Sequence, residues 1–357
     1  MTTTANTGRV TVHLDNLVSN YRLLSNRSTD ACAAVVKANA YGLGLAPVAN
    51  ALLRAGCQVF CVATLAEGLS LRALAPEQRV IVLGGVDAAG AKIAAQARLE
   101  PVINSLEQAA HWYPYREHPA TLHVDTGMQR LGMPAEDLIR VAWTDYKLAM
   151  LMTHLACADD PTEIANTEQL RRFTQVAADF PGVPTSIANS AGCLLDASFH
   201  GNLTRPGIGL YGGHPRNVLT DNPMSWVVCL EAQIVQIRRL PAHTPLGYGG
   251  TYQANDDRVI AVVGMGYADG IPRTLSNRGQ AAVGEQWLPI VGRISMDLVQ
   301  LDITDANQQL SQPLAVGDWV EFFGPNMALD QAAIWADTIA LEVLCGLGRR
   351  ARWEYID

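Results

Sequence analysis

The chain has 357 residues, of which 49% are hydrophobic, and its formal net charge is −8. This length allows two domains, or one barrel with an appended unit, and the apolar fraction allows a sizeable core. The acidic balance and the lack of a basic run argue against nucleic acid as a partner. No apolar run is long enough to cross a bilayer, and the first residues lack the layout of a signal peptide. We therefore expect a cytoplasmic protein that does not associate with membranes.

The seven cysteines are scattered along the chain and include no C-x-x-C pair. Most of them lie in apolar surroundings, which is typical of small buried hydrophobic residues rather than of disulfides or zinc ligands. We expect no metal site.

Alternating apolar residues predict a strand over residues 9–14, and an amphipathic segment follows up to residue 24. From there to about residue 213, short apolar strands alternate with helix-like stretches. Continuous apolar strands are typical of parallel sheets that are buried on both faces. Eight such units predict a (β/α)8 TIM-like barrel; a doubly wound open sheet is the alternative, weakened because no G-x-G-x-x-G follows the first strand. The eight strand candidates are residues 33–36, 59–63, 80–83, 101–103, 121–124, 148–152, 184–187 and 203–208.

The sequence changes character after about residue 225, where glycine and proline separate short strand-like runs. These features predict an α/β protein with an N-terminal barrel over residues 10–225 and a C-terminal, mainly β domain over residues 226–357. The extreme N-terminal strand is a candidate to pack with the second domain. The runs in that domain are residues 230–238, 259–264, 280–283, 287–291, 297–303 and 318–323, followed by helix-like residues 327–347.

One of the three lysines, Lys37, stands directly after an apolar strand and before a run of small residues and glycines. Lys92 lies in alanine-rich helical sequence, and Lys147 lies in a polar turn. Desolvation at a strand end can lower the pKa of a lysine and free its amine for Schiff-base chemistry. An ordinary lysine that reaches solvent is the alternative interpretation.

Two later loops suit a phosphate group. Residues 188–192 offer the hydroxyl of Ser190, and residues 205–209 offer backbone N–H groups between glycines. Because barrel strand ends carry chemistry, a phosphate loop together with a strand-end lysine describes a pyridoxal-phosphate site. His154 also ends a predicted strand, where it is either functional or a satisfied core histidine. Arg205 keeps its charge, so its burial would demand a partner.

The segment Val36-Lys37-Ala38-Asn39-Ala40-Tyr41-Gly42 is similar to the pyridoxal-phosphate attachment motif of bacterial alanine racemases. Further stretches resemble the same family in the same order, and together they span nearly the whole chain, both domains included. These stretches are residues 125–128, 130–132, 153–154, 189–190, 205–208, 266–270 and 292–297.

The resemblance implies that Lys37 carries the pyridoxal phosphate covalently and is one acid/base, while Tyr267 is the other. A racemase needs two such groups, because one face of the substrate loses the α-proton and the other regains it. In the family, the tyrosine comes from the partner subunit of a head-to-tail homodimer. The expected reaction is the interconversion of L-alanine and D-alanine, which supplies D-alanine for peptidoglycan.

The remaining site residues also follow from the resemblance. Arg205 would contact the pyridine nitrogen and oppose its protonation, because like charges repel. His154 would hydrogen-bond toward Tyr267 or Arg205. Arg130 would steady the cofactor's 3′-oxygen and the substrate carboxylate, which the backbone N–H of Met296 would also meet. The phosphate would be held by Tyr41, Ser190, Gly207 and Ile208.

Two positions depart from the family pattern. His123 stands where many members carry a carbamylated lysine, so Arg130 must be oriented by the imidazole, by a bound anion, or by nothing. Arg349 is aligned with a tyrosine that reaches the phosphate in many members, and an arginine could replace that contact with charge.

Three alternatives to alanine racemase remain. The first is a serine-preferring or broader racemase, because one hydroxyl is a small discriminant in an apolar pocket. The second is a non-catalytic pyridoxal-phosphate protein on the same barrel, although such proteins lack a second domain. The third is a decarboxylase of the same architecture, which would differ in the motif around Tyr267.

Overall fold

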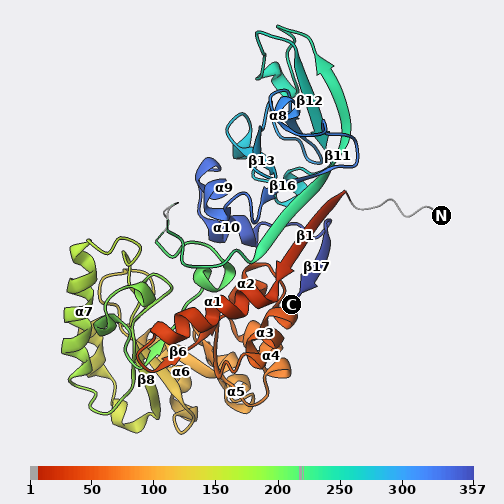
Figure 1. Ribbon diagram of the computed structural model, residues 1–357. Helices are drawn as coiled ribbons and strands as arrows, with labels where there is room; N and C mark the ends of the chain where they lie inside the picture. The colour runs from red at the N-terminus through yellow and green to blue at the C-terminus, as the bar shows by residue number, and fades with distance from the viewer. Residues whose placement is uncertain (1–6, 217–218, 220) are drawn as a thin grey trace. The chain divides into compact units, whose positions relative to one another are not determined.

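The computed structural model describes residues 7–216, 219 and 221–357, and the chain divides into two compact units. One unit is Val18–Leu210; the other comprises the chain up to Leu17 together with Tyr211–Asp357. Figure 1 shows both units along the chain. Each unit has its own sheet and its own buried core, so each is described by itself.

The unit Val18–Leu210 contains the predicted barrel, which is thereby confirmed. Seven parallel strands form one sheet in sequence order, and a two-stranded parallel sheet pairs β10 with β2. Backbone hydrogen bonds from Asn202 to Thr185 (2.7 Å) and from Arg205 to Ala188 (2.9 Å) join β10 to the β9 side, so the barrel closes. The strands are β2 (Ala31–Cys32), β3 (Ala34–Val35), β4 (Val59–Val62), β5 (Arg79–Val82), β6 (Glu100–Ile103), β7 (Ala120–His123), β8 (Leu148–Met152), β9 (Thr185–Ser186) and β10 (Leu203–Thr204).

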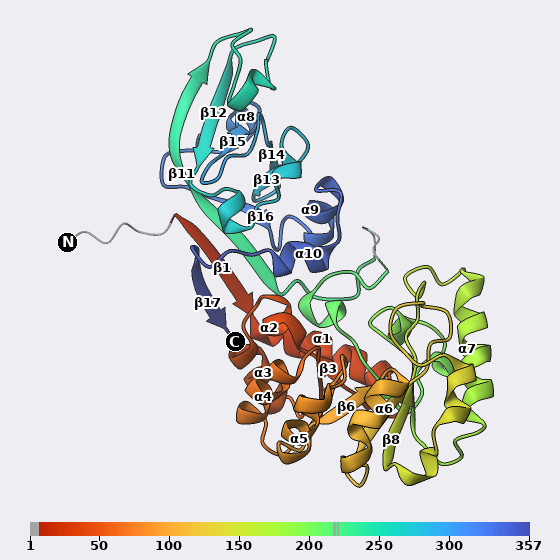
Figure 2. The ribbon, with the colours of Figure 1, turned by 180° about the vertical axis from the view of Figure 1, so that it is seen from behind.

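Helices surround the strands of the barrel, as Figures 1 and 2 show. The segments after β7 and β9 differ from the expected helical connections, because they form only short 3-10 turns. Glycines interrupt both segments, the first also contains Pro134, and these residues break helices. The helices are α1 (Leu14–Arg27), α2 (Lys37–Tyr41), α3 (Leu45–Arg54), α4 (Leu65–Leu74), α5 (Ala88–Gln96), α6 (Leu106–Trp112) and α7 (Ile164–Ala177); the turns are η2 (Ala135–Arg140), η3 (Trp143–Asp145), η4 (Gly192–Leu194) and η5 (Ala197–Phe199).

The second unit is built around a long strand, β11 (Val228–Leu240). A bulge between Ile234 and Gln236 divides it, so that its first part pairs with β1 and β16 and its second part with β12. The first strand of the chain, β1, therefore belongs to this sheet, where β17 also pairs with it in parallel. The other elements are β1 (Gly8–His13), β12 (Arg258–Val263), β13 (Gln280–Val283), β14 (Gln286–Pro289), β15 (Val299–Asp302), β16 (Trp319–Phe323), β17 (Arg352–Ile356), α8 (Ala306–Gln309), α9 (Leu329–Trp335) and α10 (Ala340–Cys345).

Two features of this unit differ from the sequence pattern. The helix-like residues 327–347 form two helices, because Asp337 adopts a φ of +58° between them. Residues 352–356 were not predicted as a strand, and they become one because β1 supplies their hydrogen-bond partners.

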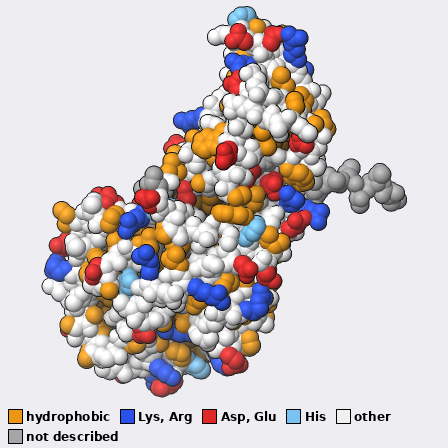
Figure 3. Space-filling view, in the orientation of Figure 1, with side chains coloured by type: hydrophobic (Ala, Val, Ile, Leu, Met, Phe, Trp, Pro, Cys, Tyr) orange, Lys and Arg blue, Asp and Glu red, His pale blue; other side chains and the backbone are white. Residues whose placement is uncertain are grey.

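The described surface carries charges of both signs. On the face shown in Figure 3, acidic and basic side chains are interspersed, with hydrophobic side chains between them. Within the described residues, no helix combines the length and the apolar character that crossing a membrane requires.

Candidate active site

The residues after β3 form an unusual turn that begins at Lys37. Four consecutive non-glycine residues, from Ala38 to Tyr41, have φ values between +52° and +56°, so the turn is left-handed. Each L-residue in this conformation costs roughly 1–2 kcal/mol, because its Cβ approaches the following carbonyl. A strained segment of this kind persists only where its surroundings fix it, and such segments cluster at functional sites.

A carboxylate from α4 holds the left-handed turn. Glu67 Oε1 accepts the Ala38 N–H at 2.8 Å, while Oε2 accepts the N–H groups of Ala63 (2.7 Å) and Thr64 (3.2 Å). The Thr64 hydroxyl accepts the Glu67 N–H in return, which completes a capping box at the start of α4. The same side chain therefore begins a helix and fixes the backbone beside Lys37.

Backbone N–H groups converge on Ser190 after β9. The N–H groups of Gly207 and Gly209 donate to Ser190 Oγ at 2.7 and 3.2 Å. Ser190 and Tyr41 are both buried, and a Cβ on Gly207 would lie 2.2 Å from Tyr41 Oη. The absence of a Cβ at 207 lets the Tyr41 hydroxyl lie close to this backbone. This cluster can bind an anion.

Arg205 follows β10 directly and is buried, with 4% of its surface exposed. Its guanidinium donates to Thr153 O at 2.7 Å, to Ile187 O at 3.4 Å and to Ser186 Oγ. All three acceptors are neutral, so these bonds leave the positive charge uncompensated. Burial lowers the Arg205 pKa to about 10, and the group stays charged at neutral pH.

Two histidines lie at neighbouring strand ends, His123 on β7 and His154 two residues after β8. Desolvation lowers the His154 pKa to about 3, and the charges of Arg205, Arg130 and Lys37 lower it in the same direction. Desolvation, together with Arg205 and Arg130, lowers the His123 pKa to about 4. Both imidazoles are therefore neutral at pH 7.

His123 has one ring nitrogen paired and one without a partner. Its Nδ1 lies 2.8 Å from Asn104 Oδ1, while the buried Nε2 makes no hydrogen bond to a described residue. Because Asn104 Oδ1 is an acceptor, we assign the proton to Nδ1, which leaves a lone pair on Nε2. His123 can thus accept a hydrogen bond at Nε2.

A compact loop presents Arg130. Asp125 carboxylate oxygens accept the N–H groups of Gly127, Met128 and Gln129 at 2.9–3.2 Å. The loop closes where Met133 N–H donates to His123 O at 2.7 Å. Arg130 is exposed at this loop, and its positive charge helps to lower the pKa of both histidines.

The other unit carries Tyr267 and Met296. Tyr267 begins the 3-10 turn η8 (Tyr267–Asp269), which follows β12, and Met296 precedes β15. Their side chains are 43% and 52% exposed. The N–H groups of Tyr267 and Ala268 donate to Ser295 O and Met296 O, both at 3.1 Å, so the two segments lie side by side.

The parallel strands thus bring most of the predicted site residues to one end of the barrel, because their carboxyl ends share one edge. The residues on this end are Lys37, Tyr41, Arg130, His154, Ser190, Arg205, Gly207 and Ile208. Tyr267 and Met296 are brought together in the other unit, to which Arg349 also belongs.

Some supporting residues were not predicted from the sequence. Thr64-x-x-Glu67 is a capping-box pattern that could have been recognised before a helix. Ser186 and Asn104 had no such signal, because their contacts depend on the closed barrel.

The fold is that of a (β/α)8 barrel enzyme, with Lys37 among the candidate site residues at the carboxyl end of its strands. Residues 12–215 match the family model for the alanine racemase N-terminal domain, and residues 227–355 match the model for the C-terminal domain. The chain belongs to the alanine racemase family, as its motifs predicted.

Individual relatives agree over nearly the full length. The chain is 43% identical to the alanine racemase of Rhodospirillum rubrum, over 98% of this chain and 96% of that one. It is 41% identical to the catabolic alanine racemase of Agrobacterium fabrum, over 98% and 92%. A crystal structure of alanine racemase from Bartonella henselae with covalently bound pyridoxal phosphate matches with a TM-score of 0.92 at 37% identity, covering 98% of this chain and 99% of that one.

Proposed function

We propose that this protein is a pyridoxal-phosphate-dependent alanine racemase, an isomerase that interconverts L-alanine and D-alanine. The observation that carries the proposal is the pairing of Lys37, on its strained turn, with an anion cradle and a buried uncompensated guanidinium at the same barrel end. A lysine, a phosphate site and a fixed partner for a ring nitrogen are what this cofactor needs.

The cradle fits a phosphate. The Tyr41 hydroxyl lies close to Gly207, and Ser190 Oγ accepts the N–H groups of Gly207 and Gly209, so its own hydroxyl hydrogen can donate to a phosphate. Ile208 would add its backbone N–H to the same group. Arg349 stays a candidate for a further phosphate contact from the second unit. When it is bound, pyridoxal phosphate would withdraw electrons from the substrate α-carbon.

Arg205 and His154 would set the character of the ring end. A charged Arg205 would disfavour protonation of the pyridine nitrogen, because two adjacent positive charges repel. In this role Arg205 would favour return of the proton over side reactions. His154 is neutral, so it can accept a hydrogen bond near Arg205 without adding charge.

Two groups would move the α-proton. Lys37 would attach the cofactor and serve as the acid/base on one face, and the phenol of Tyr267 would serve on the other. We propose that Tyr267 comes from the partner subunit of a homodimer, so that residues 10–225 of one chain and 226–357 of the next would form one site. Arg130 and the N–H of Met296 would bind the substrate carboxylate. In the described residues that N–H has no protein acceptor, which supports this role.

In the cell, the enzyme would act in the cytoplasm and supply D-alanine for peptidoglycan. A catabolic use of D-alanine is the other possibility, since one relative named above is called catabolic.

The direct test is chiral analysis of the purified protein incubated with pyridoxal phosphate and L-alanine. We expect D-alanine to form until both enantiomers are equal, and serine to react more slowly. Full cofactor loading without D-alanine would favour a non-catalytic protein. Faster turnover of serine would favour a serine racemase, and release of carbon dioxide would favour a decarboxylase.

A further inference from the structure

The phenol of Tyr267 is not held by a hydrogen bond to any described residue of the chain, and its side chain is 43% exposed. Its position within this unit therefore depends on the backbone turn η8 that carries it. Displacing a catalytic group by about 1 Å can lower a rate by roughly a hundredfold, so the rigidity of this turn matters for chemistry.

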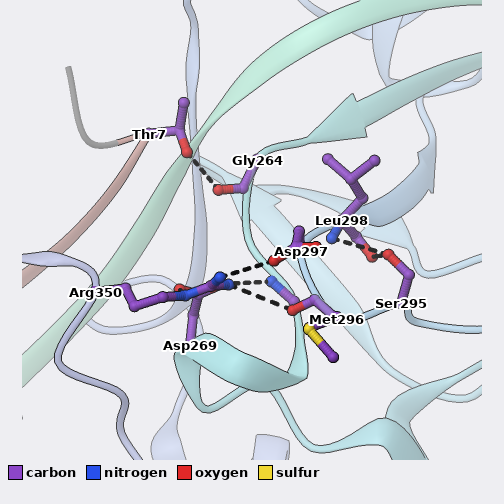
Figure 4. Close-up of polar contacts among 9 residues, drawn as sticks. Thr7, Gly264, Asp269, Ser295, Met296, Asp297, Leu298 and Arg350 are labelled. Carbon is purple, nitrogen blue, oxygen red and sulfur yellow. Dashed lines mark hydrogen bonds and ion pairs between the residues drawn. The ribbon is translucent and has the colours of Figure 1, made fainter. Parts of the chain in front are cut away.

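Several backbone contacts hold the turn in place. Asp269 caps it, because Oδ2 accepts the Gly266 N–H at 2.9 Å. The C-terminal segment packs against it, since Gly348 N–H donates to Asp269 O at 2.9 Å. At the end of β12, the Thr7 hydroxyl donates to Gly264 O at 2.5 Å (Figure 4). A Cβ on Gly266 would lie 2.4 Å from Met296 O, so the turn and the neighbouring loop are in direct contact.

The guanidinium of Arg350 connects this turn to the loop of Met296. Its Nε and Nη2 donate to the two carboxylate oxygens of Asp269 at 2.9 and 2.8 Å. Its Nη1 donates to Asp297 Oδ1 at 2.7 Å, and Nη2 lies 3.5 Å from Met296 O. Figure 4 shows Arg350 between the two segments. The Asp269 carboxylate is buried, so its bidentate pair with Arg350 is better shielded from solvent than an exposed pair.

The loop itself is rigid on its far side. Ser295 N–H donates to Leu298 O at 3.0 Å, and Leu298 N–H donates to Ser295 Oγ at 3.0 Å. These bonds close the loop around Met296 and leave its N–H pointing to no protein acceptor among the described residues. Among the described residues, Arg350 is thus the side chain that hydrogen-bonds to both the tyrosine turn and the methionine loop.

We propose that Arg350 is a positioning residue that fixes the Tyr267 phenol relative to the Met296 N–H. It would keep the phenol of Tyr267 at a fixed distance from the Met296 N–H, which would donate to the substrate carboxylate. A substrate bound through its carboxylate would then present its α-proton to the phenol. The inference rests on the proposed function for the roles of Tyr267 and Met296. We call the link that Arg350 makes between the tyrosine turn and the methionine loop the clamp. This link rests on the hydrogen bonds of Arg350 alone.

The test uses the full-length holoenzyme and the variants Arg350→Gln and Arg350→Lys, with two readouts. The first is hydrogen–deuterium exchange of the backbone amides in residues 264–271, which requires no activity. The second is loss of the α-deuterium from each alanine enantiomer, with Tyr267→Phe as the reference. Arg350→Gln should speed exchange of these amides about tenfold or more, because it removes charged hydrogen bonds. Arg350→Lys keeps the positive charge but loses the planar, bidentate guanidinium. Its amide exchange should therefore be faster than in wild type and slower than in Arg350→Gln.

For the catalytic readout, Arg350→Gln should slow the exchange of one enantiomer by about tenfold to a hundredfold. The affected enantiomer should be the one that Tyr267→Phe also affects more. Asp297→Asn releases only the loop side, so it should raise the KM for alanine without a difference between enantiomers. The control is Arg239→Gln, which breaks an exposed pair with Asp257 elsewhere in the same unit. It should change neither readout.

Unchanged amide exchange in Arg350→Gln would overturn the clamp. Faster amide exchange with equal loss for both enantiomers would overturn the positioning role and indicate general loosening. An unchanged KM in Asp297→Asn would overturn the link to Met296. If the wild-type holoenzyme does not racemise alanine, the proposed function fails, while the amide exchange still decides whether Arg350 holds the turn.

Discussion

The two turns that carry Lys37 and Tyr267 solve a similar problem in different ways. Each follows a strand, and in each a carboxylate accepts a hydrogen bond from a backbone N–H. The carboxylate belongs to Glu67 in the barrel and to Asp269 in the second unit. The lysine turn is left-handed over four non-glycine residues, whereas only the Gly270 that ends the tyrosine turn has a positive φ, of +103°.

The difference is in what opposes movement. Around Lys37 the surrounding barrel enforces a strained backbone, so relaxation would require many contacts to break together. Around Tyr267 the backbone is relaxed, and one guanidinium that is about half exposed completes the restraint. A single surface substitution should therefore loosen the phenol but not the amine. The following predictions test this contrast.

The largest effect is expected for Lys37→Ala. Removing the amine removes both cofactor attachment and one acid/base, so racemisation should fall to background and the visible absorption of lysine-bound pyridoxal phosphate should vanish. Absorption spectroscopy and chiral analysis measure both. Lys92→Ala, on the exposed face of α5, is the control and should keep both signals. Retention of the band in Lys37→Ala would show that the attachment site is elsewhere.

The next effect concerns the cradle beside the lysine turn. Gly207→Ala places a methyl group 2.2 Å from Tyr41 Oη, so either the turn or the cradle must shift. We expect the dissociation constant of pyridoxal phosphate to rise by about a hundredfold, equal to about 2.7 kcal/mol. Fluorescence titration of the cofactor-free protein measures it.

Tyr41→Phe provides the matched background for that substitution. The same glycine substitution should weaken cofactor binding less when the hydroxyl is absent, because the nearest remaining atom, Tyr41 Cζ, lies 3.1 Å away. Equal losses in the two backgrounds would mean that the clash with Tyr41 does not shape the cradle.

The barrel could be predicted from local pattern, whereas the roles of most candidate site residues came from the family resemblance and stay predictions. Apolar strands bounded by breakers mark each strand end, and Lys37, His154 and Arg205 are strand-end residues. The left-handed turn was not predictable from the sequence, because alanine, which stands at positions 38 and 40, has no preference for positive φ. The contacts of Arg350 were also not predicted, because its partners Asp269 and Asp297 lie 81 and 53 residues before it in the sequence.

The two capping carboxylates offer a direct comparison of the turns. Glu67→Gln keeps one acceptor for the Ala38 N–H but loses acceptance from Ala63 and Thr64, and should lower the free energy of unfolding by about 1–2 kcal/mol. Asp269→Asn leaves Arg350 without its bidentate partner and should lower it by about 2–3 kcal/mol. Urea denaturation measures both. A larger loss for Glu67→Gln would contradict the view that the lysine turn is held by many contacts.

The smallest effect is a change in pH dependence at the barrel end. The folded His123 has a pKa of about 4, whereas an unfolded histidine titrates near 6.5, so between these values the unfolded chain binds a proton that the folded chain does not. The contribution of His123 to the free energy of unfolding is fully present above pH 6.5. It decreases as the pH is lowered, by about 1.4 kcal/mol per pH unit. His123→Asn keeps an amide donor for Asn104 but does not titrate, so its unfolding free energy should fall less steeply between pH 6.5 and 4.5. Urea denaturation of the cofactor-free protein at several pH values measures the slope, and identical slopes in wild type and variant would show that His123 gains its proton as readily folded as unfolded.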